Sequence, residues 1–179
     1  LSMHTKIFKN IYYQKVLTNI EKWSVSLLKV SIGTNIKEGP WGGGNLFAKN
    51  LKNYLISKGH KVFHDLKEDD LDIILITEPR KTSESSAFTD TDVKKYLSFK
   101  NKDCLVVHRI NECDERKQTN YVNKYLINAN KVADETIFVS NWLKNIYMIQ
   151  GIKSNNLNVI MAGADSEIFN SHRKKVWDK

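Results

Sequence analysis

Residues 27–55 read LLKVSIGTNIKEGPWGGGNLFAKNLKNYL, and this stretch decides the fold class. Its apolar start predicts a strand over Val30–Thr34, and its amphipathic end predicts a helix over Leu46–Ser57. The glycine run Gly42–Gly44 stands between them. Glycine lets a backbone approach a ligand closely, and a helix N-terminus presents free N–H groups and a positive dipole end to an anion. The stretch therefore predicts that the chain holds a phosphorylated ligand.

Short apolar segments alternate with longer amphipathic segments along the rest of the chain. Further strands are expected to begin at Val62 and to cover Asp72–Thr77, Cys104–His108, Thr136–Val139 and Leu157–Met161. Helices are expected over Asp90–Phe99, Thr119–Val132 and Asn141–Gln150. This alternation predicts an α/β fold with a doubly wound, mostly parallel, Rossmann-like sheet, whose ligands bind beyond the carboxyl ends of the strands.

The chain length fits one domain. With 179 residues, 41% of them hydrophobic, the sequence can bury a single core, which we expect to span residues 27–170. Residues 1–26 carry apolar side chains at helical spacing and predict an extra N-terminal helical segment. Residues 171–179 are polar and basic, and we expect them to lead toward a further domain that this sequence does not contain.

The charge balance indicates an acidic partner. The net charge is +8. The opening segment contains several lysines and a single acid, Glu21, so this segment either packs on the domain or contacts an anionic membrane. No basic run is interleaved with aromatic residues, so we expect no nucleic-acid partner. Cys104 and Cys113 are the two cysteines, and no apolar leader is present, so a cytoplasmic location is expected, with peripheral membrane contact as an option.

Three segments, in this order, carry a family resemblance. The first is Gly39–Gly44 followed by a helix that ends in Lys58–Val62, the second is Val106–Asn111, and the third is Phe138–Leu143 with Val159–Phe169 behind it. Together they resemble the N-terminal, acceptor-side half of the GT-B glycosyltransferases, in the large retaining family of cell-envelope mannosyl- and glucosyltransferases (glycosyltransferase family 4-like). Ala162 departs from the family, which usually has asparagine before this glycine.

The resemblance implies transfer of a sugar from a nucleotide diphosphate to an acceptor hydroxyl, with retention at the anomeric carbon. A saccharide or lipid-linked acceptor in envelope polysaccharide or glycolipid synthesis is expected. No metal or other cofactor is expected, and this half alone is expected to be inactive without its C-terminal donor domain. His108 is then the expected catalytic-site residue. The donor diphosphate and sugar are expected at Gly42, Gly43, Gly44 and Asn45, and the acceptor or cleft residues are expected to be Arg80, Arg109, Asn111, Glu112 and Ser140.

Each of these features also has an ordinary structural explanation. The glycines permit tight packing of a helix, a lone histidine can be a satisfied core residue, and Ser140 serves as an N-cap. Asp90-Thr91-Asp92 has the spacing of a metal-binding motif, but acids at a helix start explain it. The alternative function is a non-catalytic module that docks on a membrane or polyanion. A dinucleotide-dependent enzyme is disfavoured because the spaced G-x-G-x-x-G fingerprint is absent.

Overall fold

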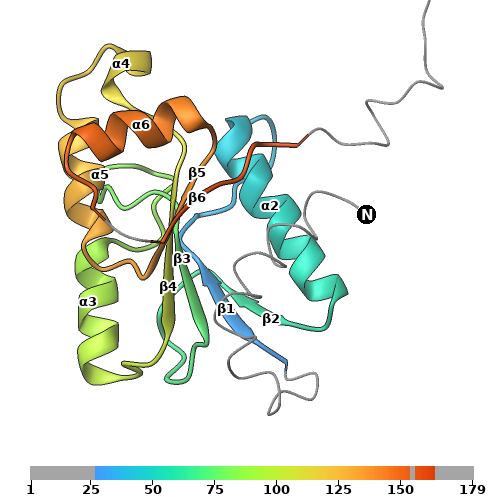
Figure 1. The fold of residues 1–179 in the computed structure, drawn as a ribbon. Helices are drawn as coiled ribbons and strands as arrows, with labels where there is room; N and C mark the ends of the chain where they lie inside the picture. Colours follow the sequence, from blue (N-terminus) through green and yellow to red (C-terminus); the bar gives the residue numbers. More distant parts are fainter. Residues whose placement is uncertain (1–26, 154–155, 164–179) are drawn as a thin grey trace, which may run out of the picture.

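The computed structural model describes residues 27–153 and 156–163 (Figure 1). The expected helical segment 1–26, the tail 171–179 and the end of the third family segment lie outside the described residues. No described helix is both long and apolar enough to cross a membrane.

Six strands form one parallel sheet in the order β2-β1-β3-β4-β5-β6. Their bounds are β1 Lys29–Ile32, β2 Lys61–Phe63, β3 Ile73–Ile76, β4 Leu105–Ile110, β5 Glu135–Phe138 and β6 Leu157–Val159. The strand order reverses between β1 and β3, which makes this a doubly wound sheet with its switch point there. The predicted α/β, Rossmann-like fold class is confirmed for the described part of the chain.

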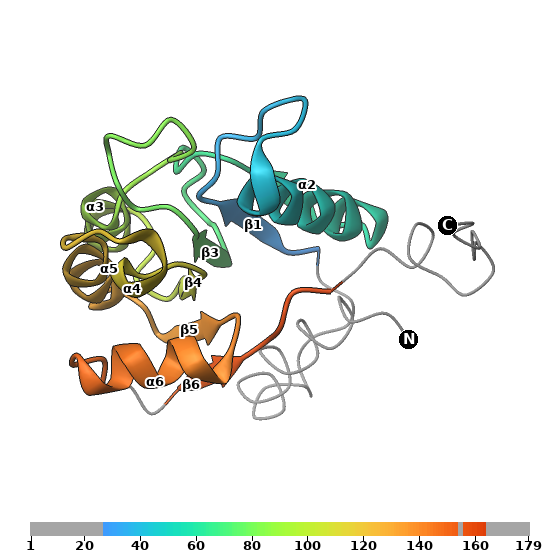
Figure 2. The same cartoon turned by 90° about the horizontal axis from the view of Figure 1, so that it is seen from above.

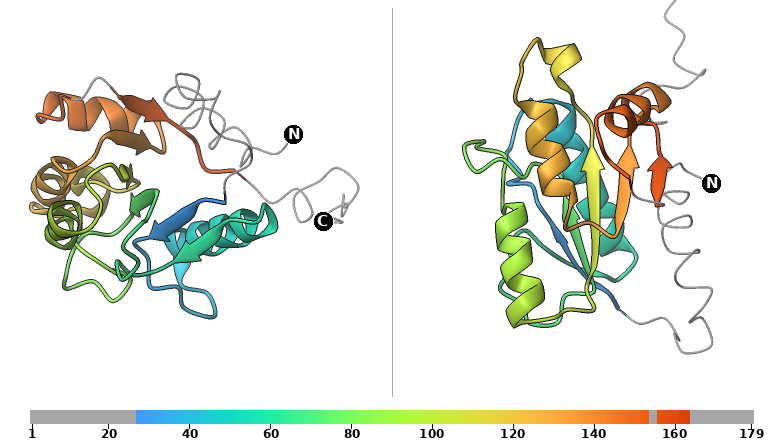
Figure 3. Two further views of the ribbon diagram at one scale, coloured as in Figure 1. Left: turned by 90° about the horizontal axis from the view of Figure 1, so that it is seen from below. Right: turned by 60° about the vertical axis from the view of Figure 1, so that its left-hand side comes forward.

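Helices cover both faces of the sheet (Figure 2). Their bounds are α2 Gly42–Ser57, α3 Asp90–Phe99, α4 Asp114–Lys117, α5 Val122–Asn130 and α6 Asn141–Ile149. One face packs against α2 through a core that includes Ala48, Leu51 and Leu55. The opposite face packs against α3, α5 and α6. In the right-hand view of Figure 3 the arrowheads of β4, β5 and β6 point to one common edge, the carboxyl edge of the sheet.

Strand β4 sends successive side chains to opposite faces. Val106 lies in the core beneath α3, while Val107 lies in the core beneath α2. The same alternation places His108 with Val106 and Arg109 with Val107. These two neighbours in the sequence therefore face different helices.

Most expected bounds lie within three residues of the observed ones; two of the differences change the site, and one helix was not expected. The helix after the glycines starts at Gly42, not Leu46, so the glycines form its first turn. β4 continues to Ile110, so His108 lies inside the strand rather than at its end. The short helix α4 occupies a stretch that is too polar to show apolar periodicity.

The end of α2 follows the prediction. Gly59 has φ +88°, its N–H donates to the Ile56 carbonyl, and the His60 N–H donates to the Leu55 carbonyl. This is the left-handed glycine termination expected of a helix that ends in Lys58-Gly59.

Candidate functional site

The first turn of α2 is exposed at the carboxyl edge, and its glycines are surrounded by open space. A Cβ atom added to Gly42, Gly43 or Gly44 would meet no other atom within 4 Å. Tight helix packing therefore does not explain these glycines. Gly42 has φ +81°, a conformation that favours glycine, but Gly43 and Gly44 have no such requirement. At Gly43 and Gly44 the absence of a side chain leaves space in which a ligand can approach the backbone.

The amides of this turn are free of protein partners in the described residues. Trp41 is the N-cap, but no side chain caps the helix, and its first turn contains no acid. With Trp41 as N-cap, the first hydrogen bond within the helix comes from Asn45, so the amides of Gly42, Gly43 and Gly44 point outward. The Asn45 amide, which was also expected to bind the diphosphate, is therefore occupied by a hydrogen bond within the helix.

The side chain of Asn45 instead fixes the loop before the helix. Its Nδ2 donates to the Lys37 carbonyl at 2.8 Å, and its Oδ1 accepts from the Lys37 amide at 2.8 Å. The ammonium of Lys37 also lies 4.5 Å from the ring centroid of Trp41. The glycine turn is therefore held from both sides while its amides stay open.

The helices on the other face begin differently. Thr89 and Asp92 form a reciprocal capping box at the start of α3. The Asp114 carboxylate accepts from the amides of Val122 and Asn123 at 2.9 and 3.0 Å and so caps α5. The Ser140 hydroxyl accepts from the Leu143 amide at 3.1 Å, which confirms the predicted cap of α6. Among the described helices of nine or more residues, α2 alone begins without a side-chain acceptor.

Arg109 extends from β4 toward this open turn. Its guanidinium carbon lies 3.9 Å from the ring centroid of Phe47, a residue of the second turn of α2. The residue is 8% exposed, and no described residue forms an ion pair or hydrogen bond with its side chain. Burial alone lowers the pKa of Arg109 to about 10, which still leaves it charged at neutral pH.

The expected site residue His108 faces the opposite side of the sheet. It is fully buried, and its Nδ1 accepts from Asn130 Nδ2 at 3.1 Å, which also donates to Thr136 Oγ1 at 2.8 Å. Burial lowers the pKa of His108 to about 3, so the ring is neutral. Its Nε2 has no partner in the described structure. The ring therefore lies in the core beneath α5, away from the glycine turn.

The expected cleft residues Arg80 and Glu112 are brought together, but they bind each other. Arg80 donates to Glu78 at 2.7 Å and also to Glu112, which in turn pairs with Lys117. Hydrogen bonds from Arg80 to Glu78, and the charge of Glu112, raise the pKa of the guanidinium. Because two carboxylates already neutralise Arg80, the predicted role of a free cation for an anionic substrate is not what this arrangement offers.

The remaining expected residues lie at the same edge without forming a catalytic cluster. Asn111 directly follows β4, and its carbonyl accepts from Arg116 at 3.1 Å. Burial raises the pKa of both cysteines, that of Cys104 to about 12, so neither thiol is activated. The described residues contain no group of three or more His, Cys, Asp or Glu arranged to hold a metal ion.

Sequence reasoning missed the partners rather than the site residues. Phe47 lies within the helix expected over Leu46–Ser57, but its contact with Arg109 was not expected, and the acid Glu78 was not connected with Arg80. Periodicity does reveal the first kind of signal, because Arg109 on a buried strand needs a covering side chain. It does not reveal the pair of Arg80 with Glu112, because these two residues are 32 positions apart in sequence.

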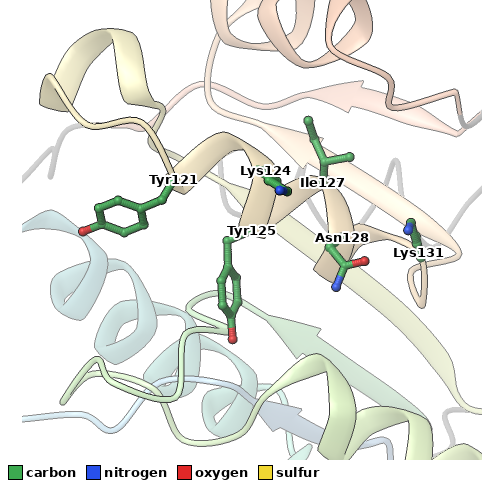
Figure 4. Close-up of a pocket in the computed structure, with 6 residues that line it drawn as sticks. All are labelled: Tyr121, Lys124, Tyr125, Ile127, Asn128 and Lys131. Atoms are coloured by element: carbon green, nitrogen blue, oxygen red, sulfur yellow. The ribbon is translucent and has the colours of Figure 1, made fainter.

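A separate hollow of about 460 Å³ lies along the outer side of α5 (Figure 4). Its lining residues are Tyr121, Lys124, Tyr125, Ile127, Asn128 and Lys131. None of the expected site residues lines it. The Tyr125 hydroxyl donates to the Pro79 carbonyl at 3.3 Å and so ties this helix to the loop after β3.

Comparison with known proteins gives a fold and no family. No protein-family profile matches the chain, and no curated protein matches it. A solved structure of an α-glucosyltransferase in complex with UDP and a 13-mer DNA containing a HMU base matches with a TM-score of 0.50 and 18% identity. The match covers 75% of this chain and 42% of that one, so the chain spans less than half of the length of the glucosyltransferase. At this identity the likeness shows a shared fold, that of a parallel Rossmann-like sheet.

Proposed function

We propose that this chain is the acceptor-side domain of a nucleotide-sugar-dependent glycosyltransferase. The observation that carries the proposal is the first turn of α2, where three glycine amides stand open beside the switch point of the sheet. Ligands of doubly wound sheets bind at this position, and a diphosphate matches the amides and the helix dipole. The fold likeness to a glucosyltransferase described with UDP supports the same class.

The chemistry of sugar transfer explains why such a turn is useful. As the bond to the sugar breaks, negative charge grows on the leaving diphosphate. Fixed N–H donors aimed at that charge stabilise the transition state without reorganisation. In this proposal the amides of Gly42, Gly43 and Gly44 supply part of that stabilisation, and no metal or further cofactor takes part.

The part of His108 is proposed to be indirect. Its ring is buried and held by Asn130, so we assign it the role of fixing the end of β4. Arg109 and Asn111 extend from that end. The expected direct contact of the His108 ring with the sugar is therefore not part of this proposal.

Retention at the anomeric carbon, a hexose donor and a saccharide or lipid-linked envelope acceptor complete the proposal, and they rest on the resemblance of the three sequence segments. A cytoplasmic location belongs to the same set of predictions. The glucosyltransferase of similar fold is described with DNA, so the predicted absence of a nucleic-acid partner gains no support from it. We propose that a donor domain supplies the rest of the active site. Robust sugar transfer by residues 1–179 alone would contradict that division.

The test is binding of nucleotide diphosphate sugars by the chain, measured by calorimetry. The variant Gly43→Ala/Gly44→Ala fills the open space beside the amides and should weaken binding about tenfold. Asn50→Ala, on the exposed side of the same helix, is the matched control and should bind as the wild type does. Equal binding by both variants would overturn the assignment of the turn.

The alternative, a membrane-docking module, rests on the lysine-rich opening segment. Lys29, in β1 directly after this segment, pairs with Glu68 at 3.0 Å and Asp70 at 2.5 Å and is therefore not part of a free basic face. The lysines of residues 1–26 lie outside the described residues. Co-sedimentation with anionic vesicles, with and without residues 1–25, decides the matter: salt-sensitive binding that is lost on truncation favours this function.

A further inference from the structure

We infer that Arg109, expected from its position to be an acceptor-loop residue, is a phosphate ligand of the α2 site: its guanidinium and the open amides of Gly42, Gly43 and Gly44 together bind a phosphate or diphosphate group. This deepens the proposed function, on which it rests for the identity of the whole substrate. The anion subsite itself is a property of the described residues.

The first step is the position of the guanidinium. A helical side chain leans toward the turn that precedes its own Cα, so Phe47 leans toward the glycine turn while it packs against the core of this face. The guanidinium carbon of Arg109 sits 3.9 Å from that ring centroid. Stacking on an aromatic face leaves the edge of the guanidinium, with its N–H groups, available for a ligand.

Arg109 has no acidic partner among the described residues. Arg109 is more than nine-tenths buried, yet no described residue pairs with it. Arg80, the other arginine at this edge, is bound to two glutamates under similar burial. A buried charge without a partner is costly, so an unpaired one at the carboxyl edge of the sheet indicates that an anion from outside completes it.

The guanidinium of Arg109 is not closed off from solvent. The guanidinium nitrogens are not among the buried polar atoms that lack a partner, which are His64 Nε2 and His108 Nε2 in the described structure. The guanidinium nitrogens therefore keep some of the small accessible area of Arg109. Arg109 and the glycine turn both lie near the carboxyl edge of the sheet, on the face that α2 covers.

The fourth step is the chemistry of the ligand. A guanidinium offers paired N–H donors in one plane, which match two oxygens of a phosphate, and helix amides offer single donors to the remaining oxygens. Lysine cannot reproduce the paired geometry. The site therefore fits a phosphate or diphosphate group better than a carboxylate or a neutral sugar.

The experiment is titration of the full chain with inorganic phosphate, inorganic pyrophosphate and UDP by calorimetry at low salt. Arg109→Met keeps an apolar side chain against Phe47 but removes the charge and the N–H donors, and should lower pyrophosphate affinity at least about tenfold, while Arg109→Lys should fall between the two. Lys95→Met removes the same charge from an exposed position on α3 and should change affinity less than about twofold. Circular dichroism of each variant shows that it is folded.

The outcomes separate the two proposals. Loss of pyrophosphate binding in Arg109→Met alone supports the subsite, and equal losses in Arg109→Met and Lys95→Met overturn it in favour of general electrostatics. Unchanged binding in Arg109→Met also overturns it. If pyrophosphate binds through Arg109 but UDP and UDP-sugars bind no better than pyrophosphate, the subsite stands and the nucleotide-sugar function fails. Tighter binding of inorganic phosphate than of pyrophosphate identifies a free phosphate as the occupant.

Discussion

The helix starts and the arginines at the carboxyl edge have different partners on the two faces of the sheet. On the face of α3, α5 and α6, each helix begins with a side-chain acceptor, from Thr89, Asp114 and Ser140 respectively, and the arginine at the edge is bound to two glutamates. On the face of α2, the helix begins with open glycines and the arginine has no acid partner among the described residues.

The difference distinguishes charged groups that are paired within the protein from charged groups that are left for a ligand. A capped helix and a paired arginine are complete within the protein, so they contribute to stability and offer little to a ligand. An uncapped helix and an unpaired arginine are incomplete, and a bound anion would complete both. The comparison predicts that changes on the paired face mainly alter stability, whereas changes on the open face mainly alter binding.

The largest effect is expected from removing the paired arginine. Arg80→Met leaves the partly buried Glu78 and the buried Glu112 without their shared cation and should lower the free energy of unfolding by about 3 kcal/mol. Arg109→Met removes a buried charge that has no partner and should change the free energy of unfolding by less than about 1 kcal/mol, or raise it. Urea denaturation of both variants measures the contrast. Similar losses in the two variants would break the comparison.

The second effect is acid sensitivity on the paired face. The pKa of His108 is lowered by burial from 6.5 to about 3, so below pH 6.5 the unfolded chain takes up a proton that the folded chain does not. Stability from this residue is therefore lost as the pH falls through 6.5, by about 3 kcal/mol at about pH 4.5. His108→Asn keeps an acceptor for Asn130 and should abolish this part of the acid destabilisation.

His60→Asn is the control for this experiment. The pKa of His60 is also lowered by burial, but it is less enclosed, so its replacement should change the pH profile much less. The measurement is urea denaturation between about pH 4.5 and 7.5. An unchanged profile in His108→Asn would mean that the imidazole is not held neutral.

A third, smaller effect tests the caps. Thr89→Ala removes the hydroxyl that accepts from the Asp92 amide at 3.3 Å and should cost about 1 kcal/mol of stability. The corresponding change at α2, Trp41→Ala, removes no cap hydrogen bond. Thermal unfolding of the two variants should show a lower midpoint for Thr89→Ala. A larger loss for Trp41→Ala would show that α2 is fixed at its start by contacts other than a cap.

The smallest effect has the opposite sign. Gly43→Ala and Gly44→Ala should each raise the free energy of unfolding by about 0.5–1 kcal/mol, because alanine favours helix and the added methyl group meets nothing. Gly42→Ala is the control and should destabilise, because Gly42 has φ +81°. Stabilisation at Gly43 and Gly44 together with weaker anion binding would show that these glycines serve the ligand at the expense of the fold.

Most of the fold was predictable because strands and helices here differ sharply in period. Asp90–Phe99 matches α3 at both ends, since a capping threonine precedes it and polar residues follow. The start of α2 was not predictable in the same way, because three consecutive glycines disfavour a helix interior. The structure nevertheless begins the helix at Gly42, so the amides of all three glycines precede its first internal hydrogen bond.

The site was predictable in its location but not in its pairings. Sequence order placed Arg80, Arg109 and Glu112 beyond buried strands, and the parallel sheet brings all three to one edge. Which arginine meets an acid depends on side-chain direction and on residues far away in the chain. His108 shows the same limit: a histidine near the end of an apolar run was expected at the cleft, but two further residues of β4 and the side of the sheet decide that it is buried.

Successive side chains of β4 point to opposite faces of the sheet, so the register of this strand decides whether His108 or Arg109 lies on the face of α2. A one-residue insertion early in this strand would exchange the imidazole and the guanidinium across the sheet. The cation would then lie beside Asn130 in a dry core, and the neutral ring would lie over Phe47. Anyone who grafts this edge onto another scaffold, or aligns a distant homologue to it, should therefore count residues in β4 before matching side-chain types.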